Sequence, residues 1–457
     1  MKFRTTFYLL LAFIALLVFV LVIEFPGEKE SRNLLVDLPP YDVEKIEFDT
    51  GESLIIITKQ NQEEWMITSP VNAPADKIQT ENLARDMSEL AYEKTVETEP
   101  SDLAKYGIPS QKIILHYKDK PEPVGILIGD KNPLDNTYFA KLENESRVVL
   151  IPSRLSTTLE KSLSDFRKKD IFRFDTEKSM SITVSNPETS WQAEKKDGEW
   201  FLVDPLDSLA DKTGIQGILD SLSSLKAEEF VSENKTDPEI RQFGLHQPSY
   251  RVEMNLPEEN KKTEFFFNRH DDAVYATTND SLKIVTVPDA ILTKLDQSLT
   301  DLRDKSIAGF YTWEVSAVDI TSRQLTLSAV KDQEETWRLD SAEGPEADIQ
   351  KIEDFLRKIS YLEASDFIDP PWDAGEYGLA DKDKKVTITV KKDQEAETIT
   401  LLIGKEDKEN NQVVLKNQRF DYLYKAGSEF LQTFPLQRKD WLKNEITEEE
   451  NAEVNRE

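Results

Sequence analysis

The chain has 457 residues and a formal net charge of −30, from 87 acidic and 57 basic side chains. This excess of carboxylates argues against broad nucleic-acid binding, because phosphates need a face of Lys and Arg. The chain has no cysteine, which excludes disulfides, thiolate metal sites and a cysteine nucleophile.

Residues 7–23 form an uncharged, apolar run of 17 residues. As a helix this run would be about 26 Å long, which reaches the lower limit for crossing a bilayer. A cleaved signal peptide is an alternative, but no pair of small residues follows the run as a cleavage site. A buried core helix is a second alternative, although it would show a polar face, which this run lacks. We therefore expect residues 1–25 to hold an uncleaved signal anchor.

The charges beside the run predict its orientation. Lys2 and Arg4 precede it, whereas Glu24, Glu28 and Glu30 follow it. By the positive-inside rule, the N-terminus stays in the cytoplasm and the rest of the chain lies in the periplasm or another extracytoplasmic space. The expected location is the inner membrane, crossed once, and residues 26–40 form a polar linker.

The elements beyond the linker alternate between strands and helices. Residues 53–58 read as a buried strand, and an amphipathic helix follows Asp76. A succession of short strands comes next, at residues 112–117, 124–128, 138–141 and 147–151. A second helix, over residues 153–167, then closes the unit.

This unit recurs three times with a period near 136 residues. Four markers keep their order and spacing: a tryptophan, an Ala-Asp pair, a glycine after an aromatic residue, and a basic closing element. They are Trp65, Trp200 and Trp337; Asp76, Asp211 and Asp348; Gly107, Gly244 and Gly378; and residues 166–170, 302–305 and 436–440. The repeat predicts modules at residues 41–175, 176–313 and 314–445, followed by an acidic, disordered tail at 446–457.

The predicted fold class is α+β, with three tandem modules that each hold an antiparallel sheet and flanking helices, after one N-terminal transmembrane helix. The shared residues read as structural. Each tryptophan is expected to anchor a core, each glycine to take a positive φ, and each aspartate to cap a helix. Gln79 would complete a capping box in the first module only.

Catalytic chemistry finds little support in the sequence. The three histidines, His116, His246 and His270, fall in unrelated contexts, and no nucleophile elbow or phosphate-binding loop is present. Residues 130–136 are rich in oxygen ligands, but they lack the order of a calcium loop, so a β-turn is the alternative that we favour. We therefore predict no enzyme activity, no catalytic, cofactor-binding or metal-binding residues, and no cofactor.

The units resemble the bacterial family of the domain of unknown function 4340. The resemblance lies in six short motifs of the first unit, and it covers nearly the whole chain beyond residue 41. The motifs are Trp65-x-Ile67-x-x-Pro70, Pro74-Ala75-Asp76, Tyr106-Gly107-Ile108, Ile126-Leu127-Ile128-Gly129, Tyr138-Phe139-Ala140 and Phe166-Arg167-Lys168-Lys169. The second unit departs at Phe267-Asn268, and the third at Glu346-Ala347-Asp348. The resemblance implies a membrane-anchored, extracytoplasmic protein that works beside transport or export systems.

The expected function is a non-enzymatic scaffold or accessory subunit of a transport or envelope complex. Its partners would be the membrane, through the single span, and proteins of that complex, without nucleic acid. The alternative is a binding module for an envelope polymer or an extracellular solute.

Overall fold

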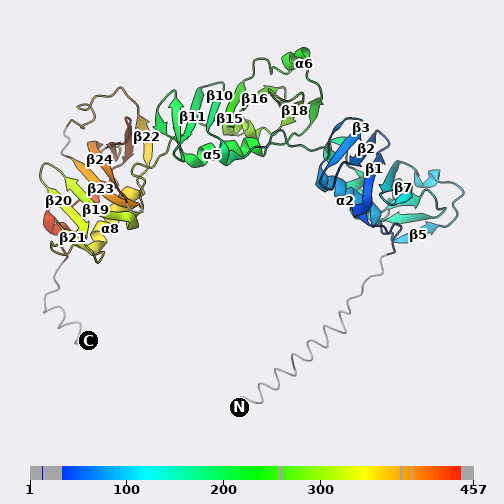
Figure 1. Cartoon of the computed structure of the whole chain (residues 1–457), viewed down its shortest axis with the longest axis horizontal. Coiled ribbons are helices and arrows are strands. Elements are labelled where there is room, and N and C mark those ends of the chain that lie inside the picture. Colours follow the sequence, from blue (N-terminus) through cyan, green and yellow to red (C-terminus); the bar gives the residue numbers. More distant parts are fainter. Residues whose placement is uncertain (1–12, 14–32, 257–260, 381–383, 393–394, 444–457) are drawn as a thin grey trace. The chain divides into compact units, whose positions relative to one another are not determined.

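The computed structural model describes Phe13 and residues 33–256, 261–380, 384–392 and 395–443. The chain divides into two compact units, Met1–Asp170 and Ile171–Glu457 (Figure 1). The first unit contains one large sheet and the second contains two, which we call the first, second and third sheets.

The first sheet has nine antiparallel strands in the order β4-β3-β2-β1-β6-β7-β8-β9-β5. Its strands are β1 Val43–Asp49, β2 Leu54–Lys59, β3 Trp65–Ser69, β4 Ala73–Pro74, β5 Lys94–Glu97, β6 Gln111–Tyr117, β7 Lys120–Lys131, β8 Tyr138–Leu142 and β9 Val148–Ile151. The helices of this unit are η1 Pro40–Asp42, α2 Lys77–Ser88, η2 Ala104–Tyr106, η3 Ser153–Leu155, α3 Ser156–Leu159 and α4 Leu163–Phe166.

Alternating apolar residues direct one face of this sheet toward α2. Along β1, Ile46 and Phe48 are fully buried, while the residues between and after them are more exposed. Leu83 and Met87, four residues apart on α2, are fully buried in the same cluster. The core of the first unit therefore lies between the sheet and this helix.

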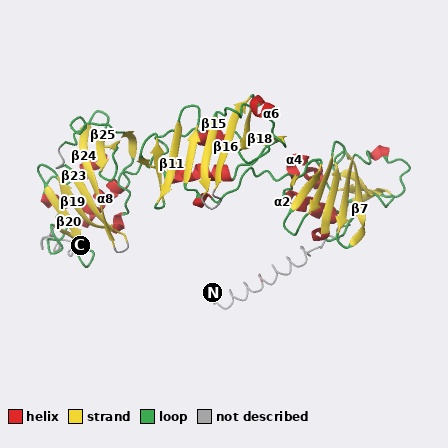
Figure 2. Ribbon diagram, turned by 45° about the horizontal axis from the view of Figure 1, so that its top comes forward, coloured by secondary structure: helices red, strands yellow, loops and turns green. Residues whose placement is uncertain are grey.

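The second sheet repeats this strand order, as β13-β12-β11-β10-β15-β16-β17-β18-β14. Its strands are β10 Ser181–Ser185, β11 Ser190–Lys196, β12 Glu199–Asp204, β13 Ser208–Leu209, β14 Phe230–Ser232, β15 Tyr250–Leu256, β16 Lys261–His270, β17 Ala273–Thr278 and β18 Ile284–Val287. The helices are η4 Thr176–Lys178, α5 Lys212–Ser223, α6 Asp237–Gln242 and α7 Ala290–Leu295. Figure 2 shows α5 lying along one face of this sheet, where Ile215, Leu219 and Leu222 are fully buried.

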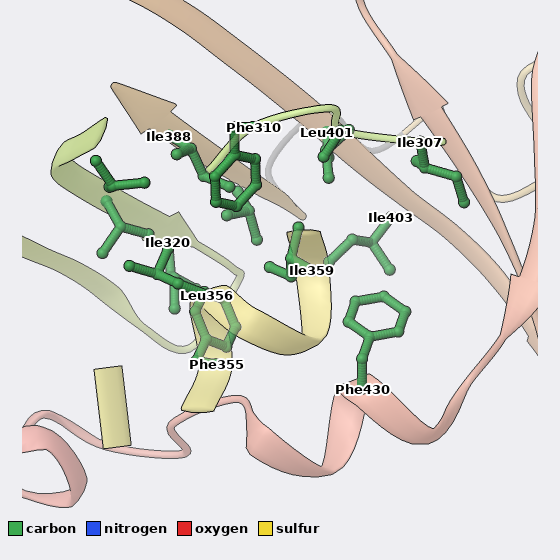
Figure 3. Packing of buried hydrophobic residues seen from close by; sticks show 14 of the residues in the cluster. Ile307, Phe310, Ile320, Phe355, Leu356, Ile359, Ile388, Leu401, Ile403 and Phe430 are labelled. Carbon is green, nitrogen blue, oxygen red and sulfur yellow. The ribbon is translucent and has the colours of Figure 1, made fainter. Parts of the chain in front are cut away.

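The third sheet has eight strands, in the order β21-β20-β19-β23-β24-β25-β26-β22. The strands are β19 Val315–Thr321, β20 Thr326–Lys331, β21 Trp337–Leu339, β22 Ala364–Ile368, β23 Lys385–Lys392, β24 Glu395–Asp407, β25 Gln412–Asn417 and β26 Leu423–Gly427. The helices are η6 Thr312–Glu314, α8 Ile349–Ser360, η7 Glu429–Thr433 and η8 Arg438–Trp441. Figure 3 shows Phe355, Leu356 and Ile359 of α8 packed toward Ile320 and Ile388 of the strands.

The predicted α+β class is wrong, because the structure is mostly β. Strands hold 41% of the described residues and helices 20%. The largest difference is at residues 153–167, which were expected to form one helix and instead form η3, α3 and α4. Ser162 begins a new helix there: its backbone N–H donates to Asp165 Oδ2 at 2.9 Å, in a capping box that interrupts the helical pattern.

Each of the three predicted core tryptophans is buried, at 3%, 1% and 2% exposure for Trp65, Trp200 and Trp337. The three predicted turn glycines also have positive φ angles, of 61°, 71° and 69° for Gly107, Gly244 and Gly378. Both sets of predictions are confirmed.

The aspartates before α2, α5 and α8 cap these helices as predicted. Asp76 accepts from the Gln79 N–H at 3.0 Å, Asp211 accepts from the Thr213 N–H at 3.0 Å, and Asp348 accepts from the N–H groups of Gln350 and Lys351. The capping box proposed for Gln79 is wrong, because its side chain instead accepts a hydrogen bond from Lys161 Nζ at 2.5 Å.

The closing element of the third module lies later in the chain than residues 436–440, where the repeat predicted it. In the first two sheets, Ala75 bridges Arg167 and Ala210 bridges Arg303. In the third, Ala347 bridges Leu442, and the Asp348 N–H donates to the Trp441 carbonyl. The equivalent segment therefore lies at residues 441–443 rather than at the Arg438 motif, because Trp441, and not Leu436, fills the core position of Phe166.

Part of the predicted linker belongs to the first unit's core. Leu35 and Val36 are 6% and 5% exposed, and both backbone N–H groups donate to the Leu90 carbonyl. The third sheet has the same arrangement, in which the Ile307 N–H donates to the Leu362 carbonyl. A short lead segment thus packs beside the segment that follows the main helix.

The predicted membrane segment at residues 7–23 lies outside the described residues, apart from Phe13, as does the predicted tail at 446–457. Among the helices of the described residues, none has the length and apolar character needed to cross a membrane.

Candidate functional site

A groove of about 400 Å³ lies between the segment leading into η6 and the C-terminal end of α8. We call it the aromatic groove; its lining residues are Ser306, Gly309, Phe310, Tyr311, Thr312, Trp313, Arg357, Ser360 and Tyr361. Gly309 has a φ of 61°, a left-handed turn that a side chain would strain. After this turn, Phe310 is buried in the third sheet's core at 6% exposure, whereas Tyr311 is 60% exposed.

Three aromatic side chains gather at this groove on the surface. Trp313 is 71% exposed and Tyr361 is 80% exposed. The rings of Tyr311 and Trp313 stack with their centroids 4.4 Å apart and their planes 14° apart. All seven tryptophans of the chain lie in its described part, and Trp313 is the single one among them that is exposed. Exposed aromatic residues grouped in this way are typical of binding surfaces.

Polar groups line the other side of the groove. Arg357 Nη2 donates to Asp354 Oδ1 at 2.6 Å, and this bond holds the pKa of the Asp354 carboxyl below its usual value. Ser360 Oγ donates to the Arg357 carbonyl at 2.9 Å, at the last turn of α8. The groove therefore combines aromatic faces with a guanidinium group and hydroxyl groups.

The second sheet has a groove in the corresponding place, between the segment leading into η4 and the end of α5. Its lining includes Asp175, Thr176, Asp220 and Ser224. Asp220 Oδ1 accepts from Thr176 Oγ1 at 2.9 Å, at the helix position that corresponds to Arg357. Arg173 and the partly buried Phe174 line it as well. The same place in the fold therefore holds carboxylates and hydroxyl groups beside an arginine in the second sheet, and exposed aromatic rings beside an arginine in the third.

A second feature is the joint between the second and third sheets, which we define by Arg303, Asp369, Phe367 and Tyr422. Arg303 is 3% exposed and follows the last helix of the second sheet. Its Nη1 donates to Asp369 Oδ1 at 2.8 Å and Oδ2 at 3.0 Å, and its Nε donates to Ser208 Oγ at 3.0 Å. The guanidinium carbon also lies 3.8 Å and 4.4 Å from the ring centroids of Phe367 and Tyr422.

Backbone and amide contacts extend the joint. The Ala364 N–H donates to the Lys305 carbonyl at 2.8 Å, and Asn417 Nδ2 donates to the Ile307 carbonyl at 2.9 Å in a buried contact. Residues 303–307 thus run from one sheet directly onto the other, and both backbone and side-chain hydrogen bonds connect the two sheets of this unit.

The three histidines lie on separate elements. His116 is on β6, where its Nε2 is 2.9 Å from Glu47 Oε1. His270 ends β16 and packs against the rings of Phe243 and Tyr275, while His246 follows the turn at Gly244.

The oxygen-rich segment at residues 130–136 uses its groups internally. Asp135 Oδ1 accepts from the Asn132 side chain at 2.8 Å and from the Thr137 hydroxyl at 2.6 Å. These bonds close a tight turn around Asn136, whose φ is 59°. Within the part of the chain that the structure describes, no group of three or more His, Asp or Glu is arranged to hold a metal ion.

Sequence reasoning missed both the aromatic groove and the joint. The groove had one available signal: the position of Trp313 is held by Tyr41 in the first module and Glu177 in the second, so this residue is outside the shared pattern. No signal in the sequence indicated the joint, since Arg303 and Asp369 are 66 residues apart in the chain.

Comparison with protein families identifies a family for this chain. The model of the domain of unknown function DUF4340 matches residues 65–208 and again residues 200–379. No curated protein matches the chain.

Among solved structures, the DNA polymerase III subunit beta from Pseudomonas aeruginosa is similar over 86% of this chain and 94% of its own, with 11% identity and a TM-score of 0.14. A DNA polymerase sliding clamp from the same organism, with ligand, is similar over 86% of this chain and 93% of its own, with 10% identity and a TM-score of 0.15. Scores this low support no statement about the fold or function of this chain.

Proposed function

This chain belongs to the DUF4340 family, and from that premise we propose that it is a non-enzymatic, membrane-anchored scaffold or accessory subunit of a transport or envelope complex. Its sheets lie on the extracytoplasmic side of the inner membrane, and one N-terminal span holds them there. The proposal assigns no reaction and no cofactor to the chain.

The anchoring part of the proposal is supported by the sequence. The uncharged run at residues 7–23 has the length of a short span, and Lys2 and Arg4 precede it. The net charge of −30 opposes contact of the sheets with anionic lipid head groups.

The observation that carries the scaffold role is the joint at Arg303. A scaffold must hold its binding surfaces at set separations, and a flexible linker cannot do so. Here a bidentate ion pair, two aromatic faces and backbone pairing join the second and third sheets without an intervening linker. Such a joint supports a rigid spacer.

Topology can be tested by cysteine labelling, because the chain has no cysteine of its own. Glu188→Cys, on an exposed turn of the second sheet, is expected to react with a membrane-impermeant maleimide in whole cells whose outer layers have been permeabilised. Thr5→Cys is expected to react only after the inner membrane is opened. Labelling of both positions from the same side would overturn the anchored topology.

The scaffold role is tested by crosslinking in native membranes followed by purification of the full chain. A stable complex with a membrane protein of a transporter is the expected result. Recovery of the chain without any crosslinked partner would overturn the proposal.

A second candidate function, a binding module for an envelope polymer, is favoured by the aromatic groove. A chain that binds such a polymer without any protein partner would support this candidate over the scaffold.

A further inference from the structure

We propose that the aromatic groove of the third sheet binds an uncharged polysaccharide, with sugar rings stacked on Tyr361 and on the Tyr311–Trp313 pair. This inference deepens the second candidate function by naming its ligand class, and it does not depend on the membrane-anchored scaffold role.

The aromatic faces provide the apolar half of the site. A pyranose ring presents C–H bonds on its face and hydroxyl groups around its edge. The C–H face carries partial positive charge, which the negative face of an aromatic ring attracts. Tyr311 and Trp313 stack on each other, so each ring covers one face of its neighbour and presents its outer face to a ligand, and the pair does not form a closed cage. Both rings remain mostly exposed at 60% and 71%, which leaves them free for a ligand.

The polar half of the site surrounds these rings. Ser306, Thr312 and Ser360 line the groove with hydroxyl groups, and Arg357 provides several N–H donors. A sugar needs this combination, because its edge hydroxyls must replace the hydrogen bonds that they lose to water. The side chain of Arg357 is 64% exposed, so its remaining donors are accessible to a ligand.

Charge selects an uncharged polymer over an anionic one. The chain has a net charge of −30, and the ion pair with Asp354 offsets the charge of Arg357, which lines the groove. A polyanion would therefore approach against the field of the whole protein. A quaternary ammonium ligand is disfavoured as well, because the guanidinium group faces the same groove and the parallel rings do not enclose a cation.

The groove of the second sheet provides a built-in comparison. It has the same place in the fold, but Asp175 corresponds to Tyr311, Glu177 to Trp313 and Ser224 to Tyr361. Since these groups cannot stack on a sugar face, binding is expected in the third sheet and not in the second.

The test is a fluorescence titration of the full chain with hexamers of β-1,4-linked glucose and of β-1,4-linked N-acetylglucosamine. Trp313 is the exposed tryptophan, so its emission and its quenching by acrylamide report on the groove. We expect at least one hexamer to shift the emission and to protect it from acrylamide. Trp313→Ala should weaken binding at least tenfold, measured by calorimetry, and Tyr361→Ala should weaken it severalfold.

The control variant is Tyr41→Ala, which removes an aromatic side chain that is 75% exposed at the corresponding place in the first unit. It should leave binding unchanged. Circular dichroism of each variant confirms folding, which these exposed positions should preserve.

Three outcomes would overturn the proposal. The first is no binding of either hexamer, and the second is binding of the hexamer to Trp313→Ala as tightly as to the unmutated chain. The third is binding of choline or a proline-rich peptide in the groove when neither hexamer binds there. Crosslinking of Trp313→Ala to its membrane partner is the separate readout for the scaffold. If Trp313→Ala loses sugar binding but still crosslinks to the membrane partner, the result bears on the groove and leaves the scaffold role unaffected.

Discussion

Arg303 Nη1 lies 2.8 Å from Asp369 Oδ1 and 3.0 Å from Oδ2, and these two residues, 66 positions apart in the chain, join the second and third sheets. The two partners differ in exposure: the Arg303 side chain is 3% exposed and that of Asp369 is 42% exposed. Water can therefore solvate the carboxylate when its partner is removed, whereas it cannot reach the guanidinium group.

This difference predicts an asymmetric response to mutation. Asp369→Ala leaves a buried cation without its acceptor and should lower the free energy of unfolding by about 2–3 kcal/mol. Arg303→Met keeps an apolar stem between Phe367 and Tyr422, leaves only a hydrated carboxylate, and should cost about 1 kcal/mol. Urea denaturation of the full chain measures both values.

Arg419→Met is the matched control for the joint, because it breaks an exposed ion pair with Glu199 between the same two sheets. Its expected cost is below about 0.5 kcal/mol. Spin labels at Glu188→Cys and Glu409→Cys report on the distance between the sheets. A distance distribution that stays equally narrow in Asp369→Ala would show that the pair does not fix the joint.

Asp304, beside the joint, should make stability depend on pH. Burial raises the pKa of this carboxyl, and the negative charges of Asp211, Glu199 and Glu363 raise it further, against a lowering by the Ser306 N–H. The ionised side chain therefore destabilises the folded state at neutral pH, and this cost disappears as the pH falls through the folded pKa toward the ordinary aspartate value of about 3.9.

Asp304→Asn should accordingly raise the free energy of unfolding at pH 7, because it removes the buried negative charge. In the unmutated chain the Ser306 N–H donates to Asp304 Oδ1 at 2.9 Å, and the amide oxygen of asparagine can still accept this hydrogen bond. The gain over the unmutated chain should shrink as the pH is lowered. Denaturation at a series of pH values measures it, and a gain that stays constant or grows on acidification contradicts the assigned cause.

The residues predicted correctly from sequence share one property: local chemistry determines their role. A helix needs an acceptor at its first turn, so Asp76, Asp211 and Asp348 could be identified from the pattern that follows them. A turn with positive φ favours glycine wherever it occurs, and a tryptophan repeated at a fixed period is explained by a core position.

The features that sequence analysis missed depend on contacts between distant segments. The helical periodicity of residues 153–167 is real, but the Ser162–Asp165 box divides that segment. Ile349 fits the apolar stripe of α8 and is nevertheless 49% exposed, because it lies at the first helical position, away from the sheet. The aromatic groove likewise depends on α8 ending beside the segment that leads into η6.

The three predicted caps can be compared by one substitution. Asp348→Ala should lower the free energy of unfolding by about 1 kcal/mol, because it removes an acceptor from the first-turn N–H groups of Gln350 and Lys351. Asp348→Asn should cost much less, since asparagine is an equally good cap. Thermal melts of the two variants measure this difference, and equal losses would contradict a capping role.

Three glycines separate the costs of backbone conformation and of space. Gly217 lies inside α5 with open space around an added Cβ, so Gly217→Ala should stabilise the chain by about 0.5–1 kcal/mol through helix propensity. Gly198 also has open space around an added Cβ but a φ of 84°, and Gly198→Ala should destabilise the chain by about 1 kcal/mol through backbone strain alone.

At Gly378 the φ is 69° and an added Cβ would lie 2.9 Å from the backbone nitrogen of Lys405. Gly378→Ala should therefore cost clearly more than Gly198→Ala. Chemical denaturation ranks the three variants, and a Gly378→Ala cost no larger than that of Gly198→Ala would contradict the tight approach of β24 to this turn.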